Sequence, residues 1–210
     1  MKTAPPTRGR PRGFDRDKAL AKAMELFWDK GYEGASMAEL TSVMGIGAPS
    51  LYAAFGSKEE LFRQAVDLYC DTEGGIIWRN ALAAPTAFES VKAFLMTTAR
   101  EFTRADRPRG CLVILSALHA TESSATVRAE LTAKRRQCIQ VLADHLGRGI
   151  ERGEIAPGTD LEGLARYYLT VQQGMSIQAR DGADQRMLEV IAEAALASWA
   201  PMTGATNARP

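Results

Sequence analysis

The chain has 210 residues, of which 46% are hydrophobic and 24% are charged, and its formal net charge is +1 at pH 7. A chain of this length and composition can bury a sizeable core in one or two domains without a metal or a disulfide. The near-neutral balance lacks the strongly basic signature of many nucleic-acid-binding proteins, so an argument for such binding must rest on local charge.

The three cysteines are an odd and sparsely placed set, which excludes a disulfide scaffold. The sequence also has no apolar N-terminal segment typical of a signal peptide and no apolar run long enough to span a membrane. We therefore expect a cytoplasmic protein with no membrane partner.

Residues 1–13 are rich in proline, glycine and arginine and have no hydrophobic periodicity, so they are predicted to be a flexible basic arm. Lys2, Arg8, Arg10 and Arg12 all precede the first acidic residue, Asp15. Such a tail suits contact with phosphates or a minor groove, although a disordered solubilising tail has the same composition. The run from Arg8 to Pro11 resembles the core of an AT-hook, which favours the minor groove.

The first helix is expected to begin at Phe14 or Asp15 and to end at Lys30 and Gly31. Apolar residues recur in it at three- and four-residue spacing: Ala19, Leu20, Ala23, Met24 and Phe27.

A pair of short helices follows directly. Ser36 and Glu39 have the spacing of a capping box, and glycines at 45 and 47 allow a tight turn. Pro49 suits the first turn of the next helix, which we expect from Ala48 to Phe55. Two short helices joined by a glycine turn indicate a DNA-binding helix-turn-helix.

A further capping box, Ser57 to Glu60, begins a helix predicted to run from about Lys58 to Thr72. The ordered run from Ala19 to Phe62, with its LF-x-x-KGY and SLY-x-x-FGSKEELF segments, closely resembles the TetR/AcrR family of bacterial repressors. The resemblance covers the N-terminal quarter of the chain and implies a DNA-binding domain over residues 14–60.

Within that domain, the resemblance assigns phosphate contacts to Tyr52 and Lys58. The N-terminal end of the second helix of the motif enters the major groove in such domains, which makes Gly47, Ala48, Pro49 and Ser50 candidates for base contact. Ala53, where the family often has a polar residue, offers only a methyl group, so direct base readout is expected to be sparse.

Helix N-termini bind anions, and Ser36 and Thr41 are therefore further candidates for phosphate contact.

The rest of the chain is also predicted to be helical, with helices capped at Thr86 and Thr159, a long helix from Ala125 to Arg152 and a last one from Asp184 to Trp199. No useful strand-like alternation appears. The expected fold is all-α, with about nine helices, a second domain over residues 61–200 and a flexible tail over 201–210.

The resemblance implies that the second domain pairs two chains into a homodimer and holds a pocket for a small-molecule effector. Two apolar stripes are the candidates for the dimer interface: Leu164, Tyr168, Val171, Met175 and Ala179, and Leu188, Ile191, Ala195 and Trp199. The candidate pocket residues combine apolar and hydrogen-bonding side chains: Trp78, Phe94, Phe102, Cys111, Leu115, Leu118, His119, Tyr167 and Gln172.

Cys111 follows Arg107 and Arg109 and begins a short apolar segment. Nearby arginines and a helix N-terminus would favour its thiolate, so one hypothesis is that Cys111 senses electrophiles or oxidants. The alternative is a buried cysteine that packs as a small apolar residue.

The sequence contains only two histidines, no metal-binding spacing, no P-loop and no dinucleotide fingerprint. We therefore expect neither an enzyme nor a cofactor. The preferred function is a dimeric repressor that an unknown small-molecule effector releases from a near-palindromic double-stranded DNA operator. The alternative is a helical ligand-binding or electrophile-sensing module whose DNA-binding head is vestigial.

Overall fold

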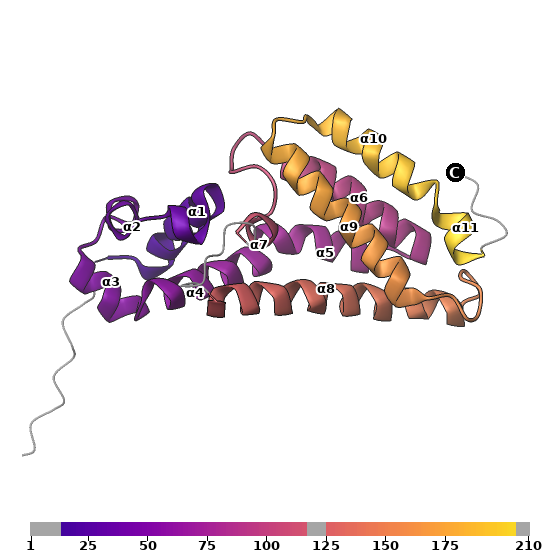
Figure 1. The fold of residues 1–210 in the computed structure, drawn as a ribbon, viewed down its shortest axis with the longest axis horizontal. Helices are drawn as coiled ribbons and strands as arrows, with labels where there is room; N and C mark the ends of the chain where they lie inside the picture. The colour runs from indigo at the N-terminus through magenta and orange to yellow at the C-terminus, as the bar shows by residue number, and fades with distance from the viewer. Residues whose placement is uncertain (1–13, 117–124, 205–210) are drawn as a thin grey trace, which may run out of the picture.

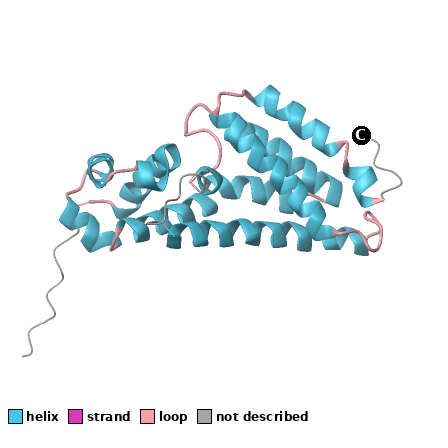
Figure 2. Cartoon of the chain, in the orientation of Figure 1, coloured by secondary structure: helices cyan, strands magenta, loops and turns pink. Residues whose placement is uncertain are grey.

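The structure, a computed structural model, describes residues 14–116 and 125–204, and within these ranges all regular secondary structure is helical (Figure 2). The helices are α1 (Arg16–Gly34), α2 (Met37–Met44), α3 (Ala48–Phe55), α4 (Lys58–Asp71), α5 (Glu73–Leu82), α6 (Ala87–Phe102), α7 (Leu112–Leu115), α8 (Ala125–Glu151), α9 (Leu161–Arg180), α10 (Gln185–Leu196) and α11 (Trp199–Thr203). Over the described residues, nine helices have eight or more residues, and α7 and α11 are shorter. The prediction of an all-α fold with about nine helices is confirmed.

The molecule is elongated, with α1, α2 and α3 at one end and α5, α6, α9, α10 and α11 at the other (Figure 1). Helix α4 leads from the first group to the second, and the long helix α8 runs along one side (Figure 1). We call α1–α4 the head and α5–α11 the body.

The end of the first helix differs from the expectation. Gly31 has φ 72°, which interrupts the helical geometry, but the chain resumes a helical turn that ends at Gly34. At Thr72, close to the predicted end of the helix, the backbone (φ −108°, ψ −90°) separates α4 from α5, and α5 then includes Gly74 and Gly75.

Helix caps explain most of the starts. The Ser36 capping box is present, and the side chains of Ser57 and Thr86 accept hydrogen bonds from the backbone N–H groups of Glu60 and Glu89. The start of α9 corrects the prediction, because Asp160 is the capping residue. The Thr159 hydroxyl instead donates to the carbonyl of Ala156.

The end of the chain also differs from the predicted tail over 201–210. Helix α11 continues to Thr203, whose side chain is buried and whose carbonyl accepts from the N–H of Ala156. This packing orders residues 201–204, and residues 205–210 lie outside the described residues.

The described residues form two apolar cores, one in the head and one in the body. The head core includes Phe27, Leu40, Leu51, Phe55 and Phe62. It extends along α4 to Tyr69 and includes residues of α7 and the start of α8, so the predicted boundary at residue 60 falls at the beginning of a helix that belongs to both parts.

The head and the body are joined by directed hydrogen bonds as well as by apolar packing. The Trp28 indole N–H donates to the Gly110 carbonyl (3.1 Å). The Arg180 guanidinium at the end of α9 donates to the carbonyls of Trp28 (2.6 Å) and Asp29 (2.9 Å). The C-terminal half of α1 is therefore fixed to the turn before α7 and to the end of α9.

Candidate nucleic-acid interface and ligand cavity

Helix α3 presents one face to the head core and the other to solvent. Gly45, in the left-handed region (φ 67°), turns the chain after α2, and Gly47 caps α3 with no side-chain hydrogen bond. Leu51 and Phe55 are buried, whereas residues 47–50, Tyr52 and Ala53 are exposed. The exposed end is the N-terminal end, which is the part of a recognition helix that approaches base edges.

Tyr52 and Lys58 border this exposed face. Half of the Tyr52 side chain is exposed (50%). The Lys58 ammonium lies 4.6 Å from the centre of the Tyr32 ring, and partial burial lowers its pKa. The negative charge of Glu33 acts on Lys58 and opposes this shift.

Ser36 and Thr41 make local hydrogen bonds. The Ser36 hydroxyl accepts from the Glu39 N–H and donates to the Glu39 carboxylate (2.7 Å). The Thr41 hydroxyl donates to the carbonyls of Met37 and Ala38. Both hydroxyl groups therefore already donate to acceptors within the head. To donate to a phosphate, each side chain would have to break these local hydrogen bonds.

The basic arm, with Arg8, Arg10 and Arg12, lies outside the described residues. Phe14, the first residue described, lines a shallow concave surface together with Gly47, Ser50 and Ala53. The chain therefore enters the head beside the exposed end of α3.

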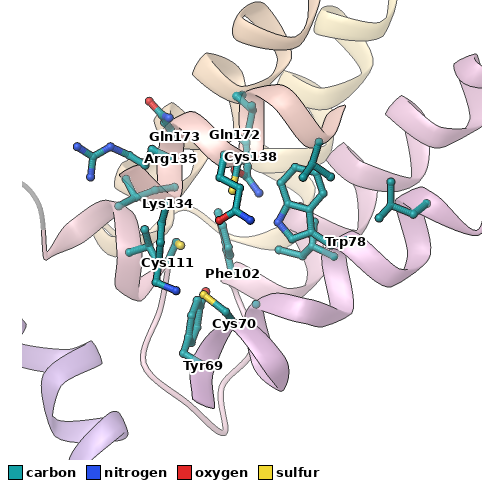
Figure 3. Close-up of a pocket in the computed structure, with 18 residues that line it drawn as sticks. Tyr69, Cys70, Trp78, Phe102, Cys111, Lys134, Arg135, Cys138, Gln172 and Gln173 are labelled. Atoms are coloured by element: carbon teal, nitrogen blue, oxygen red, sulfur yellow. The ribbon is translucent and has the colours of Figure 1, made fainter. Parts of the chain in front are cut away.

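A second candidate site is a cavity of about 240 Å³ lined by residues of α4, α5, α7, α8 and α9 and by Phe102 at the end of α6. Its walls are mostly apolar, and the aromatic side chains in them are Tyr69, Trp78 and Phe102 (Figure 3). The charged and amide side chains that line it are Lys134, Arg135, Gln137, Gln172 and Gln173. All three cysteines of the chain, Cys70, Cys111 and Cys138, also line it.

Burial raises the pKa of each of these thiols, to about 11 for Cys70 and to about 12 for Cys138. Burial also raises the pKa of Cys111, and the neighbouring Tyr69 hydroxyl opposes only part of this shift.

The predicted activation of Cys111 by its neighbouring arginines is therefore wrong. Arg107 pairs with Glu73, and the Arg109 guanidinium donates to the carbonyl of Ala179 (3.4 Å). Both arginines have partners of their own, and burial of the Cys111 thiol outweighs the remaining favourable contacts.

Comparison with known proteins adds to this geometry. Residues 19–65 match the pattern described as "Bacterial regulatory proteins, tetR family", and residues 87–195 match the pattern described as "Tetracyclin repressor-like, C-terminal domain". The chain is 38% identical over 194 residues to the HTH-type transcriptional repressor ComR of Escherichia coli (strain K12), and the match covers 92% of each chain. The chain belongs to the TetR family.

Two further relatives of this TetR-family chain are informative. It is 31% identical over 196 residues to the HTH-type transcriptional repressor BdcR of the same organism, with 93% of each chain covered. It also resembles a cysteine mutant of the TetR regulator CifR, solved in complex with 26-bp double-strand operator DNA, with a TM-score of 0.88 and 47% identity. That match covers 91% of this chain and all of the CifR chain.

Only some of the predicted pocket residues line the cavity of the body. Trp78, Phe102, Cys111 and Gln172 line it. Phe94 is fully buried behind Trp78 (ring centroids 5.1 Å apart), Leu115 and Tyr167 do not line the cavity, and Leu118 and His119 lie outside the described residues. Sequence reasoning did not find the contribution of Tyr69, Cys70, Lys134, Arg135 and Cys138, because no local pattern brings α4 and α8 together.

The predicted dimer stripes need a correction. Most of their side chains are buried in the core of the body within a single chain: Leu164, Tyr168, Met175, Ala179, Leu188, Ala195 and Trp199. Val171 and Ile191 are partly buried against the same core. Apolar residues at helical spacing show only which face of a helix is apolar, and here that face packs within the same chain.

Exposed apolar side chains lie on other faces of α9 and α10. They are Ile177 (38% exposed), Met187 (59%) and Val190 (51%). Gly174 is an exposed position on α9. No atom would lie within 4 Å of a Cβ added there, so another helix could approach closely.

Within the described ranges, no helix is long and apolar enough to cross a membrane, and no three histidine, cysteine or acidic residues are grouped so as to hold a metal ion.

Proposed function

We propose that the chain is a DNA-binding transcriptional repressor that uses α3 as its recognition helix. The observation that carries the proposal is the exposure of the N-terminal end of α3, residues 47–50, while Leu51 and Phe55 on the opposite face of the helix are buried in the head core. The named repressors among its relatives and the CifR complex with operator DNA support the same function.

The proposed contacts follow the geometry of the head. Residues 47–50 and Ala53 face the bases, and Tyr52 and Lys58 contact phosphates on either side. Since α3 offers few polar side chains for base readout, the basic arm contributes by contact with the adjacent minor groove. A repressor acts where the DNA is, so the proposal includes a cytoplasmic location, and it includes no enzymatic role.

The proposal further includes a homodimer and a small-molecule effector. The exposed apolar surface formed by Gly174, Ile177, Met187 and Val190 is the dimer interface in this proposal, because an apolar patch on two adjacent helices favours association. The effector binds in the cavity of the body and changes the separation of the two heads.

The experiment is a selection of bound duplexes from a random library at moderate salt, followed by fluorescence anisotropy on the enriched sequence. We expect an inverted repeat, two chains per site, and an affinity that falls steeply with salt.

The variant Tyr52→Phe tests the phosphate contact, because it keeps the ring and removes the hydroxyl that is proposed to donate to phosphate. Its affinity should fall by about the contribution of one hydrogen bond to a charged group, roughly tenfold. If no sequence is enriched, the head is vestigial and the chain is a ligand-binding module.

A further inference from the structure

Helix α3 lies at one end of the elongated molecule (Figure 1) and has few side chains that can form hydrogen bonds. Its sequence, from Ala48 to Phe55, contains no charged and no amide side chain, and only Ser50 and Tyr52 carry a hydroxyl. Guanine and adenine are read in the major groove chiefly by arginine, lysine, asparagine or glutamine, which bond to two atoms of one base. The side chains of α3 cannot make such paired hydrogen bonds.

The solvent-facing side of α3 instead contributes small side chains to a concave surface. Ser50, Ala53 and Ala54 have the spacing i, i+3 and i+4, so they share one face of the helix. All three line the concave surface together with Phe14 and Ile46. Ser50 and Ala53 are exposed, and Ile46 and Ala54 are partly buried. Apart from the Ser50 hydroxyl, the side chains that line this surface are therefore apolar.

Two glycines of the turn before α3 complete the concave surface and keep it open. Gly45 and Gly47 both line it, and neither has a side chain that would fill it. A Cβ added at Gly45 would have no atom within 4 Å, and one at Gly47 would lie 3.7 Å from Cδ of Pro49. A small group that enters from outside can therefore reach the methyl group of Ala53 without displacing any part of the head.

We propose that α3 selects thymine by contact between the 5-methyl group of the base and the side chain of Ala53. The thymine methyl is the one apolar group that an unmodified base pair presents in the major groove, and alanine is one of the side chains that contact it. Ala53 is thus the specificity-determining residue of the helix. The inference rests on the proposed function, in which α3 is the recognition helix.

Deoxyuridine separates this contact from readout by the basic arm. It differs from thymidine only in that it lacks the 5-methyl group, which lies in the major groove. The hydrogen-bonding groups of the minor groove are the same for both, so the proposed minor-groove contact of the arm is not removed by the exchange. A loss of affinity on exchange of thymine for uracil therefore reports on a contact in the major groove.

The test replaces the thymines of the selected operator by deoxyuridine, one symmetric pair at a time, and measures binding of the full chain by fluorescence anisotropy. We expect one pair to be sensitive, with a loss of roughly fourfold for each methyl group and about sixteenfold for both half-sites. Thymines outside the inverted repeat are the control and should tolerate uracil. A repeat without thymine, or one in which every thymine tolerates uracil, would overturn the proposal.

The variant Ala53→Gly assigns the contact to a residue. It removes the methyl group of Ala53, so the ratio of the affinities for the thymine and uracil operators should fall toward one. Ala38→Gly, at an exposed position of α2 that does not line the concave surface, is the matched control and should keep the ratio of the unmutated protein. Because each ratio compares two DNAs with the same protein, a loss of stability affects both affinities alike. An unchanged ratio in Ala53→Gly would contradict the assignment.

A second comparison restores the methyl group on another base. With a C·G pair at the sensitive position, 5-methylcytosine should bind more tightly than cytosine by the same factor per methyl group, and equal affinities would contradict the proposal. The outcomes also separate this inference from the proposed function. If no operator is selected, both fail. If an operator is bound specifically but its thymines tolerate uracil, the repressor function stands and only the thymine contact fails.

Discussion

Lys58 is a charged side chain that packing within the head holds in place. Its ammonium lies over the Tyr32 ring, which holds it at the start of α4, and burial lowers its pKa. A held cation loses less side-chain freedom on contact with phosphate than a free one. The sequence resemblance indicated the phosphate contact, but only the structure locates the ring that holds the lysine.

At the residue scale we predict that Lys58→Ala weakens DNA binding evenly across sequences and reduces the slope of log affinity against log salt by about 0.9 per chain, or about 1.8 for a dimer. Anisotropy at several salt concentrations measures this slope. Lys92→Ala, an exposed lysine of α6 in the body, is the matched control and should leave the slope unchanged. Equal slopes for Lys58→Ala and the unmutated protein would show that Lys58 does not contact a phosphate.

Helix α2 shows how local sequence decides an element. Ser36 caps it reciprocally with Glu39, and Glu39 also pairs with Lys30 of α1. One carboxylate thereby connects the start of α2 to the preceding helix. The capping spacing was readable in the sequence, whereas the pairing with Lys30 depends on the path of the chain after Gly31.

At the element scale we predict that Ser36→Ala lowers the free energy of unfolding by about 1 kcal/mol, since it leaves an N-terminal N–H of α2 without its acceptor. Urea unfolding followed by circular dichroism measures the change. Ser42→Ala, an exposed serine later in the same helix, is the control and should be close to neutral. Similar losses for both variants would show that the cap is unimportant.

A second prediction at this scale concerns pH. Hydrogen bonds from Lys30 and Ser36 lower the pKa of Glu39 from 4.5 to about 2. A carboxyl whose pKa is lower in the folded state stabilises the fold above about pH 4.5, and this contribution is lost as pH falls toward 2. Glu39→Gln should therefore reduce the fall in melting temperature between pH 5 and pH 3, and an identical fall in both proteins would contradict the assignment.

At the scale of the whole molecule, the head and the body share helices and contacts. The head core includes residues of α7 and α8, and Arg180 of α9 donates to the carbonyls of Trp28 and Asp29. The cavity lies beside these contacts, at Tyr69 and Cys111. A change in the cavity is therefore positioned to alter how the head is held.

For the assembly, we predict that the double substitution Met187→Asp and Val190→Asp converts a dimer into a monomer without unfolding it. Both side chains are more than half exposed, so a charge costs little in the isolated chain but is buried unpaired in a dimer. Sedimentation velocity measures the state. Val43→Asp, an exposed apolar residue of the head, is the control. A double variant that remains dimeric would place the interface elsewhere.

The sequence by itself determined the all-α class, the start and end of α2 and α3, and the exposed end of the recognition helix, because caps, glycine turns and helical periodicity act over a few residues. The tertiary structure decided which apolar faces are internal. Leu164 and Tyr168 pack inside the body, while Met187 and Val190 remain exposed, and periodicity cannot distinguish a face that packs within the chain from one that meets a partner. Likewise, only the packing of α4, α7 and α8 together brings Cys70, Cys111 and Cys138 to one cavity, since contacts between distant segments leave no local pattern.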